Sequence, residues 1–423
     1  MRVGLLVLAA FAAAPTTAAD LLPKDRQRVV FLGDSNTFAG HFIAYIEAYL
    51  ITRFPERKIE LINLGLPSET VSGLSEADHP YPRPNVHDRL ATALAATKPH
   101  VVVACYGMND GIYSPFDEAR FKKYQHGMLK LIADCEKAGA RVVLMTPDPF
   151  DARPLKDKVL PKGAEKYSWL RPYEKYDEEV LTKYSEWLLT LRAKGYAVAD
   201  PHAAILRHLA KMRKKEPEYR VSGDGIHPNE TGHLFVALEL LAALKAPLNP
   251  PPGETPSTEP EEKSPFVLVS DSAWPTFLYT DRLDPPGDPK WDARLTNWTD
   301  ATANSRVRIP KVPGEGGMKY DLIVSDKKVV TLSKKEWESG IDLRPHLPNA
   351  VGKVKRAAEL FDLVSQKQKM MGLAWLTDVG HKRPDTPKGI PLAEAKSKAG
   401  ELDLRIRKLA QPDFVSVGIV PAK

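Results

Sequence analysis

The sequence has 423 residues, of which 43% are hydrophobic and 27% charged, so it is long enough to bury a sizeable core as an ordinary soluble protein. Its formal net charge at pH 7 is only +6, and its 60 basic and 54 acidic residues are interspersed. We find no basic stripe with interleaved aromatic residues, which argues against a nucleic-acid partner.

The first residues, MRVGLLVLAAFAAAPTTAAD, combine one arginine, an apolar core and small residues before Asp20. This pattern predicts an export signal over residues 1–19, cleaved after Ala19, and the alternative is an uncleaved anchor. No later run approaches the roughly 18 apolar residues of a membrane helix. We therefore expect no integral membrane segment in the mature chain, and a periplasmic or extracellular location.

From residue 28 to residue 246, apolar β-branched segments alternate with segments of helical period. Strands are expected at 28–33, 58–65, 99–107, 140–147 and 196–200. Helices are expected at 41–54, 87–97, 119–139, 175–195, 203–216 and 231–245. Continuous apolar strands between helices predict a parallel sheet covered on both faces, with ligands bound beyond the carboxyl ends of its strands.

The sequence changes character after residue 248. Residues 249–265, NPPPGETPSTEPEEKSP, are rich in proline and glutamate and predict a linker that cannot build a core. Residues 266–423 are expected to form a smaller mixed α+β accessory region, β-rich and then helical. Its helical patterns cover 349–376 and 392–410, and its strand patterns lie within 264–280, 318–332 and 414–420. We find no chemical motif there, so its role is left open.

Only two cysteines, Cys105 and Cys135, occur in the chain, within a strand pattern and a helix pattern. We expect two buried thiols, and a disulfide between them is the alternative in an exported protein. A CxxC metal site is absent from the sequence.

The stretch FLGDSNTFAG places Ser35 at the end of the first strand and at the start of a helical pattern. Free backbone N–H groups and the helix dipole at such a point favour developing negative charge, which suits a nucleophile. Serine is also a favoured helix cap, so this stretch alone leaves both interpretations open. The next residue, Asn36, could contact substrate or cap the helix.

A serine nucleophile needs a base, and His227 in SGDGIHPNE is the candidate among 11 histidines. Asp224 lies three residues earlier, a spacing that lets its carboxylate reach the imidazole in a turn and fix its tautomer. Oxyanion donors could come from Gly65, where a strand ends, and from the side-chain amide of Asn109 in CYGMNDG. Ordinary turn chemistry is the alternative for each of these residues.

Taken together, the segments GDSNT, NLGLPS, GMND and DGIHP resemble, in order, the four blocks of the SGNH hydrolases, also called GDSL-type esterases and lipases. The resemblance covers residues 28 to 246 and implies a three-layer α/β/α, flavodoxin-like fold for the domain at 20–248. It implies that Ser35 is the nucleophile, His227 the base and Asp224 its orienting acid. The oxyanion hole would comprise the Ser35 N–H, the Gly65 N–H and the Asn109 side chain, with no cofactor or metal.

The segment 148–176 is long enough to be a lid or binding loop. Its aromatic residues Tyr167, Trp169 and Tyr173 could stack on sugar rings or pin the loop down. By analogy with exported members of the family, we expect an O-acetylesterase acting on small-molecule or carbohydrate esters. The alternatives are a lysophospholipase or thioesterase, and a non-catalytic binding protein on the same scaffold. The sequence does not determine the oligomeric state.

Overall fold

The computed structural model describes residues 21–248, 266–270, 276–281, 306–307, 318–339, 341–342 and 350–422. The expected export signal at 1–19 and the expected linker at 249–265 lie outside these residues, so both stay predictions.

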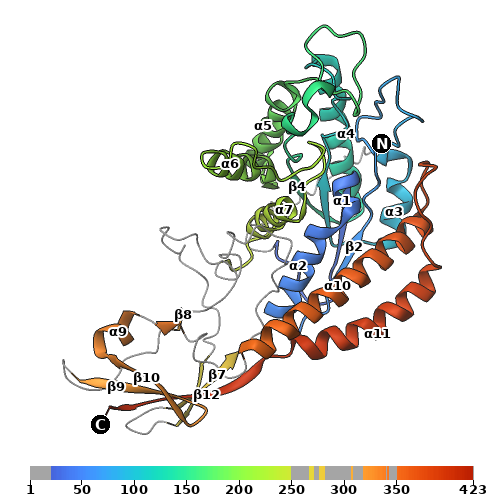
Figure 1. Ribbon diagram of the computed structural model, residues 1–423. Helices are drawn as coiled ribbons and strands as arrows, with labels where there is room; N and C mark the ends of the chain where they lie inside the picture. The colour runs from blue at the N-terminus through green and yellow to red at the C-terminus, as the bar shows by residue number, and fades with distance from the viewer. Residues whose placement is uncertain are drawn as a thin grey trace, which may run out of the picture.

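Within residues 21–248, helices flank a parallel sheet (Figure 1). The sheet has five strands in the order β2-β1-β3-β4-β5. The strands are β1 (Arg28–Gly33), β2 (Glu60–Asn63), β3 (Val101–Cys105), β4 (Arg141–Met145) and β5 (Ala197–Ala199). The order reverses beside β1, because β2 lies on one side of it and β3 on the other. Parallel α/β folds bind ligands at such a switch point, beyond the carboxyl ends of the strands.

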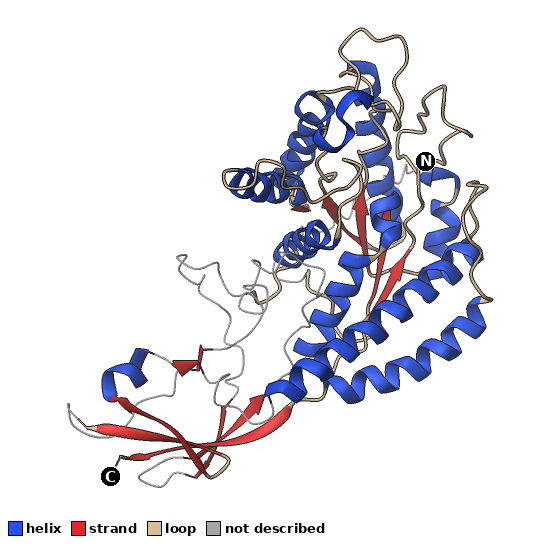
Figure 2. Ribbon diagram, viewed as in Figure 1, coloured by secondary structure: helices blue, strands red, loops and turns tan. Residues whose placement is uncertain are grey.

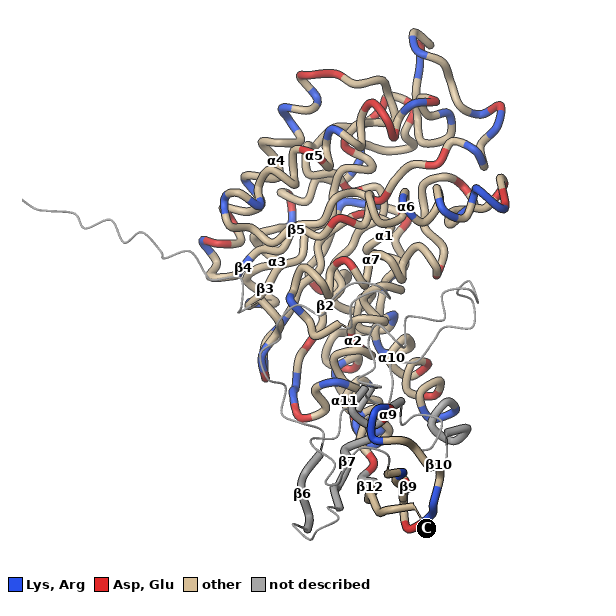
Figure 3. Tube along the Cα trace, turned by 90° about the vertical axis from the view of Figure 1, so that its left-hand side faces the viewer, with Lys and Arg blue, Asp and Glu red and all other residues tan. Residues whose placement is uncertain are grey.

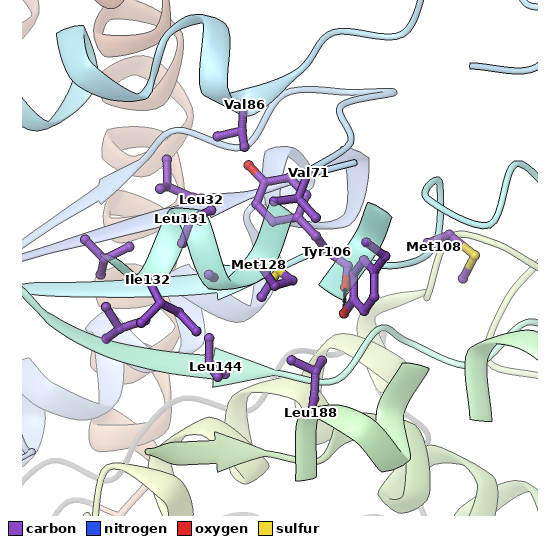
Figure 4. Close-up of a cluster of buried hydrophobic side chains, with 14 of the residues drawn as sticks. Leu32, Val71, Val86, Tyr106, Met108, Met128, Leu131, Ile132, Leu144 and Leu188 are labelled. Carbon is purple, nitrogen blue, oxygen red and sulfur yellow. Dashed lines mark hydrogen bonds between the residues drawn. The ribbon is translucent and has the colours of Figure 1, made fainter. Parts of the chain in front are cut away.

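Alternate residues of each strand face opposite sides of the sheet, and each side has its own helices. Val30 and Leu32 belong to a core cluster with α3 (Leu90–Thr97), α4 (Glu118–Lys137) and α5 (Thr182–Thr190) (Figure 4). Val29 and Phe31 pack with α2 (His41–Arg53), α6 (Pro201–Arg213) and α7 (Glu230–Ala243). The predicted three-layer α/β/α, flavodoxin-like architecture is confirmed.

Short elements complete this part of the chain. They are α1 (Ser35–Ala39) and the 3₁₀ or π turns η2 (Val86–Asp88), η3 (Arg153–Lys158), η4 (Asp177–Leu181) and η5 (Leu191–Lys194). The helix predicted over 175–195 is observed as one continuous helical run made of η4, α5 and η5, since the junction residues Leu181 and Thr190 are themselves α-helical. At its start, the Asp177 carboxylate is drawn inward, where it accepts the Phe150 N–H at 2.8 Å and lies 3.2 Å from His202 Nε2.

The C-terminal part contains a separate antiparallel sheet (Figure 2). Its strand order is β10-β9-β12-β7-β6. Its strands are β6 (Phe266–Ser270), β7 (Thr276–Asp281), β9 (Lys319–Val324), β10 (Lys327–Ser333) and β12 (Asp413–Pro421). A two-stranded pair, β8 (Arg306–Val307) with β11 (Ile341–Asp342), and the helix α9 (Lys334–Ser339) are also described. Strand β12 lies between β7 and β9 and so joins the β6–β7 and β9–β10 pairs into one sheet.

Two long helices, α10 (Ala350–Val379) and α11 (Leu392–Ala410), run beside α2 (Figure 1). Ala44, Ala48 and Ile51 of α2 share a buried cluster with residues of both helices. The sheet covers the opposite side of α2, which explains why this helix is apolar almost all round. These two C-terminal helices therefore pack directly on the α/β fold.

Acidic and basic residues are interspersed along the described trace (Figure 3). Among the described residues, no helix is both long enough and apolar enough to cross a membrane. Cys105 and Cys135 are free, buried thiols.

Candidate active site

Ser35 is the first residue of α1, directly beyond the carboxyl end of β1. The Asp34 side chain caps this helix by accepting the Asn36 N–H at 3.0 Å. A Cβ atom on Gly33 would lie 2.1 Å from Thr37 Oγ1 and 2.8 Å from the Cys105 carbonyl oxygen, so this tight turn requires glycine. The turn sets the Ser35 hydroxyl at the switch point of the sheet.

His227 reaches Ser35 from the loop that precedes α7. Its Nε2 atom lies 2.8 Å from Ser35 Oγ, a hydrogen-bond distance between residues 192 positions apart. Its Nδ1 atom lies 2.7 Å from Asp224 Oδ2. The structure thus brings together the three residues that the sequence singled out as nucleophile, base and orienting acid.

The loop from Asp224 to His227 is organised around one carboxylate oxygen. Asp224 Oδ1 accepts the backbone N–H of Ile226 at 3.0 Å and of His227 at 2.9 Å, while Oδ2 faces the imidazole. Because the carboxylate accepts a hydrogen bond from Nδ1–H, the neutral imidazole carries its proton on Nδ1, and Nε2 is the acceptor that faces Ser35. This tautomer is the one that can remove the hydroxyl proton.

Burial and pairing act in opposite directions on the two ionisable groups. Burial lowers the pKa of His227, but the hydrogen bond and negative charge of Asp224 outweigh it and hold that pKa above the ordinary 6.5. Burial raises the pKa of Asp224, but hydrogen bonds from the His227 side chain and from backbone N–H groups keep it well below its usual range. Asp224 is therefore ionised at neutral pH and can stabilise an imidazolium.

Asn109 follows β3 at the same edge of the sheet and is 4% exposed. Its Oδ1 accepts the Tyr113 hydroxyl at 2.8 Å, and its Nδ2 donates to the Glu69 carbonyl at 3.2 Å. The tyrosine fixes which end of the amide carries the donors. Its N–H groups therefore lie beside the segment that follows β2, and its role in the oxyanion hole stays a prediction.

Gly65 does not fit the donor role that the sequence assigned to it. Its N–H already donates to Asn63 Oδ1 at 2.9 Å. A Cβ atom there would lie 2.3 Å from the Phe38 nitrogen and 2.6 Å from the Thr37 carbonyl carbon, so glycine is needed for close packing on α1. Sequence inspection could not show this, because it depends on where the Asn63 side chain points.

Ser68, in the same segment after β2, has an unusual backbone conformation, and the sequence did not point to this residue. Its φ is +67°, a left-handed conformation that is uncommon for residues other than glycine. Arg83 Nη1 donates to its carbonyl at 3.3 Å, and the next residue, Glu69, accepts from Asn109. The signal that could have pointed to it is its place in a polar turn after a strand.

Asn36 is neither a substrate contact nor a helix cap. Its side chain is 5% exposed, and its Nδ2 donates to Asp148 Oδ2 at 2.9 Å and to the Ile226 carbonyl at 3.4 Å. The cap is Asp34. Burial of Asn36 contradicts the predicted substrate contact, and its partner Asp148 was not singled out from the sequence, although it too follows a strand.

The aromatic residues of the segment 148–176 divide into two kinds. Tyr173 is 1% exposed, so it has no ring face for a sugar, and the predicted stacking role is wrong for it. The Tyr167 hydroxyl donates to the Pro161 carbonyl at 2.7 Å and accepts the Ala164 N–H at 3.0 Å, which pins the loop. Trp169 is 38% exposed, and its contact with substrate stays a prediction. Among the described residues, no cluster of three or more potential metal ligands occurs.

Residues 31–234 match the profile of the GDSL-like Lipase/Acylhydrolase family. Among solved structures, the chain is similar to BT4096, a gut microbial diltiazem-metabolizing enzyme, with 17% identity, 95% of this chain and 99% of that chain covered, and a TM-score of 0.61. It also matches the acetylxylan esterase Axe2 of Geobacillus stearothermophilus (18% identity, 52% and 95% covered, TM-score 0.38). A third match is the acetyl xylan esterase AlAXEase (20% identity, 51% and 98% covered, TM-score 0.38).

The likeness to BT4096 shows a shared fold that extends over the C-terminal region as well. No match was found among curated proteins.

Proposed function

Through residues 31–234 the chain belongs to the GDSL-like lipase/acylhydrolase family and is a carboxylic ester hydrolase, and we propose that it acts through Ser35, His227 and Asp224 by way of an acyl-enzyme. The observation that carries this mechanism is the continuous hydrogen-bonded chain from Asp224 Oδ2 through the imidazole to Ser35 Oγ, with distances of 2.7 and 2.8 Å. A binding protein would have no need for a base and its orienting acid.

In the first half-reaction His227 Nε2 removes the Ser35 proton as Oγ attacks the ester carbonyl. The imidazolium, stabilised by ionised Asp224, then protonates the leaving alcohol, and the acyl group remains on Ser35. In the second half-reaction His227 removes a proton from water, which attacks the acyl-enzyme. Collapse of the second tetrahedral intermediate releases the carboxylic acid and returns the proton to Ser35.

Each tetrahedral intermediate carries an oxyanion that needs donors already in place. We assign two of them to the Ser35 N–H, at the start of α1, and to Asn109 Nδ2, oriented by Tyr113. The third is the Ser68 N–H rather than the Gly65 N–H, because the latter is bonded to Asn63. The left-handed backbone at Ser68 and the contact of its neighbour Glu69 with Asn109 support this assignment.

The substrate class that we propose is an O-acetyl ester on a carbohydrate-type alcohol. Lipid-active enzymes need an apolar surface, and the large exposed hydrophobic residues among the described ones are few and mostly scattered. They are Leu129, Trp169, Leu170, Met318, Leu404 and Val420. A lysophospholipase or thioesterase is the alternative.

An acyl-chain-length series of p-nitrophenyl esters tests the substrate class. We expect kcat/KM to be highest for the two-carbon ester and to fall steeply with chain length. A preference for chains of about eight carbons or more would refute deacetylation and favour the lipid-type alternative. Labelling by a fluorophosphonate that is lost in Ser35→Ala tests the nucleophile separately, because only an activated serine reacts.

We also propose export, from the sequence pattern of residues 1–19. Expression of the full chain in a Gram-negative host and N-terminal sequencing of the periplasmic protein test it. A mature protein that begins at Asp20 is expected, and a full-length chain retained in the cytoplasm would contradict export.

A further inference from the structure

Asn36 and Asp148 form a buried polar pair beside the nucleophile. Asn36 lies next to Ser35 in α1, and Asp148 follows β4, 112 positions later. The two residues are 5% and 3% exposed, and the Asn36 amide donates to Asp148 Oδ2 at 2.9 Å. The same amide lies 3.4 Å from the carbonyl oxygen of Ile226, the residue before His227. The pair therefore connects the helix of the nucleophile with the loop of the base.

Two oxygens of this pair are orphaned. Asn36 Oδ1 and Asp148 Oδ1 are both buried and have no hydrogen-bond partner among the described residues. An ionised carboxylate oxygen and an amide oxygen are both hydrogen-bond acceptors only. While Asp148 is ionised, the two oxygens therefore cannot bond to each other. Buried acceptors without a donor are costly. A proton on Asp148 Oδ1 would turn one of these acceptors into a donor and allow a second hydrogen bond, to Asn36 Oδ1.

The groups around Asp148 favour the neutral acid. The nearby charged or titratable side chains are Asp34 before α1, Cys105 at the end of β3, His202 on α6 and His227. Burial and the negative charge of Asp34 raise the pKa of Asp148 to about 7, against the opposing effects of the Asn36 hydrogen bond and the two histidines. Cys105 is itself buried, and burial raises the pKa of its thiol, so it brings no charge at neutral pH.

We propose that Asp148 is held as a neutral acid in a two-hydrogen-bond pair with Asn36, and that this pair is a positioning element for the His227 loop. Ionisation of Asp148 would remove its O–H donor and leave two acceptors, Asp148 Oδ1 and Asn36 Oδ1, without a hydrogen bond between them. We expect the contact of Asn36 with the Ile226 carbonyl to loosen as a result. Ionisation would also add a negative charge to those of Asp224 and Asp34 near His227, which raises the pKa of the base. The positioning role rests on the proposed function of His227. The protonation of Asp148 is independent of that function.

Infrared difference spectroscopy of the full mature chain tests the proton directly. The spectrum of the unaltered protein minus that of Asp148→Asn should contain the carbonyl band of a protonated carboxyl group at about pH 5. The band should vanish as the pH is raised through about 7. At about pH 5 residue 148 is neutral in both proteins, so other buried acids, such as Asp34, contribute equally and cancel in the difference. A difference spectrum without this band at about pH 5 would overturn the neutral pair.

Kinetics tests the positioning role. Asp148→Asn keeps one donor and one acceptor facing Asn36, so we expect it to retain activity at about pH 6 and to move the alkaline limb of kcat/KM to higher pH. Asn36→Leu should lower kcat by about 10- to 100-fold with little change in KM, because a small misplacement of the base is costly. If the pH profile of kcat/KM for Asp148→Asn coincides with that of the unaltered protein, the positioning role of the pair is refuted.

A double variant separates positioning from stability. Asn36→Leu with Asp148→Leu removes both polar partners, so its melting temperature should recover relative to Asn36→Leu alone, while kcat should not. Recovery of kcat together with stability would reduce the pair to a structural one. If the unaltered protein hydrolyses no ester, the proposed function fails, and the infrared result still decides the protonation of Asp148.

Discussion

Lys367 on α10 donates its ammonium N–H to Glu47 on α2, across 320 positions of the sequence. Glu47 is 3% exposed in a helix that is otherwise largely apolar, and Lys367 is 8% exposed. Gln368 donates to the other Glu47 oxygen at 2.6 Å, and Asp403 of α11 accepts from Lys367 at 2.6 Å. This buried network binds the accessory helices to a core helix of the hydrolase fold.

Replacing Lys367 should therefore destabilise the α/β domain itself. Lys367→Met keeps the length of the side chain but leaves the Glu47 carboxylate buried without its cation, and we expect a loss of about 3–5 kcal/mol. Urea unfolding at pH 7 measures it. Lys369→Met, at an exposed position of the same helix, is the matched control and should change stability little. Equal losses for the two variants would contradict a specific role of the buried pair.

Gly65→Ala should affect both folding and catalysis. Its new Cβ would overlap the backbone of Thr37 and Phe38 in α1, and relieving the overlap should cost about 1–3 kcal/mol. Because α1 carries Ser35, kcat should also fall. Gly400→Ala on α11 is the control, since a Cβ there meets nothing within 4 Å, and it should stabilise slightly. An unchanged melting temperature in Gly65→Ala would show that the packing constraint is not real.

Asn109→Ala should lower kcat by about 10²- to 10³-fold, because it removes an oxyanion donor that acts in the transition state. Tyr113→Phe keeps that donor but removes the hydroxyl that orients it. We expect kcat to fall about fivefold, which corresponds to one hydrogen bond of about 1 kcal/mol. Steady-state kinetics on an acetate ester measures both. A rise in KM with unchanged kcat for Asn109→Ala would point to ground-state binding instead.

The pH dependence follows from the paired histidine. His227 must be neutral to accept the Ser35 proton, and its pKa is raised above 6.5 by Asp224. Protonation therefore begins at a higher pH than for an ordinary histidine, and kcat/KM should fall as the pH drops through a midpoint above 6.5. In Asp224→Asn the residual activity should show a lower midpoint. A midpoint at or below 6.5 in the unaltered protein would argue against the pairing.

Most elements of the fold follow from short-range patterns. The helix predicted over 392–410 is observed as Leu392–Ala410, and the five parallel strands were all expected from their apolar, β-branched runs. The helix predicted over 175–195 is observed as one helical run through η4, α5 and η5. Only its opening π turn, where the Asp177 carboxylate contacts the Phe150 N–H and His202, was not expected. A periodicity of apolar residues carries no information about such a contact.

The sequence by itself singled out Ser35, Asn109, Asp224 and His227 through four blocks that resemble those of the SGNH hydrolases, although each turn alone left other interpretations open. Turn chemistry and apolar period are properties of a few neighbouring residues, so they can be read without the fold. Only the tertiary structure decided that the Gly65 N–H is taken, that Asn36 faces Asp148, and that Lys367 meets Glu47. Those pairings join distant segments, and their geometry depends on how helices pack on the sheet.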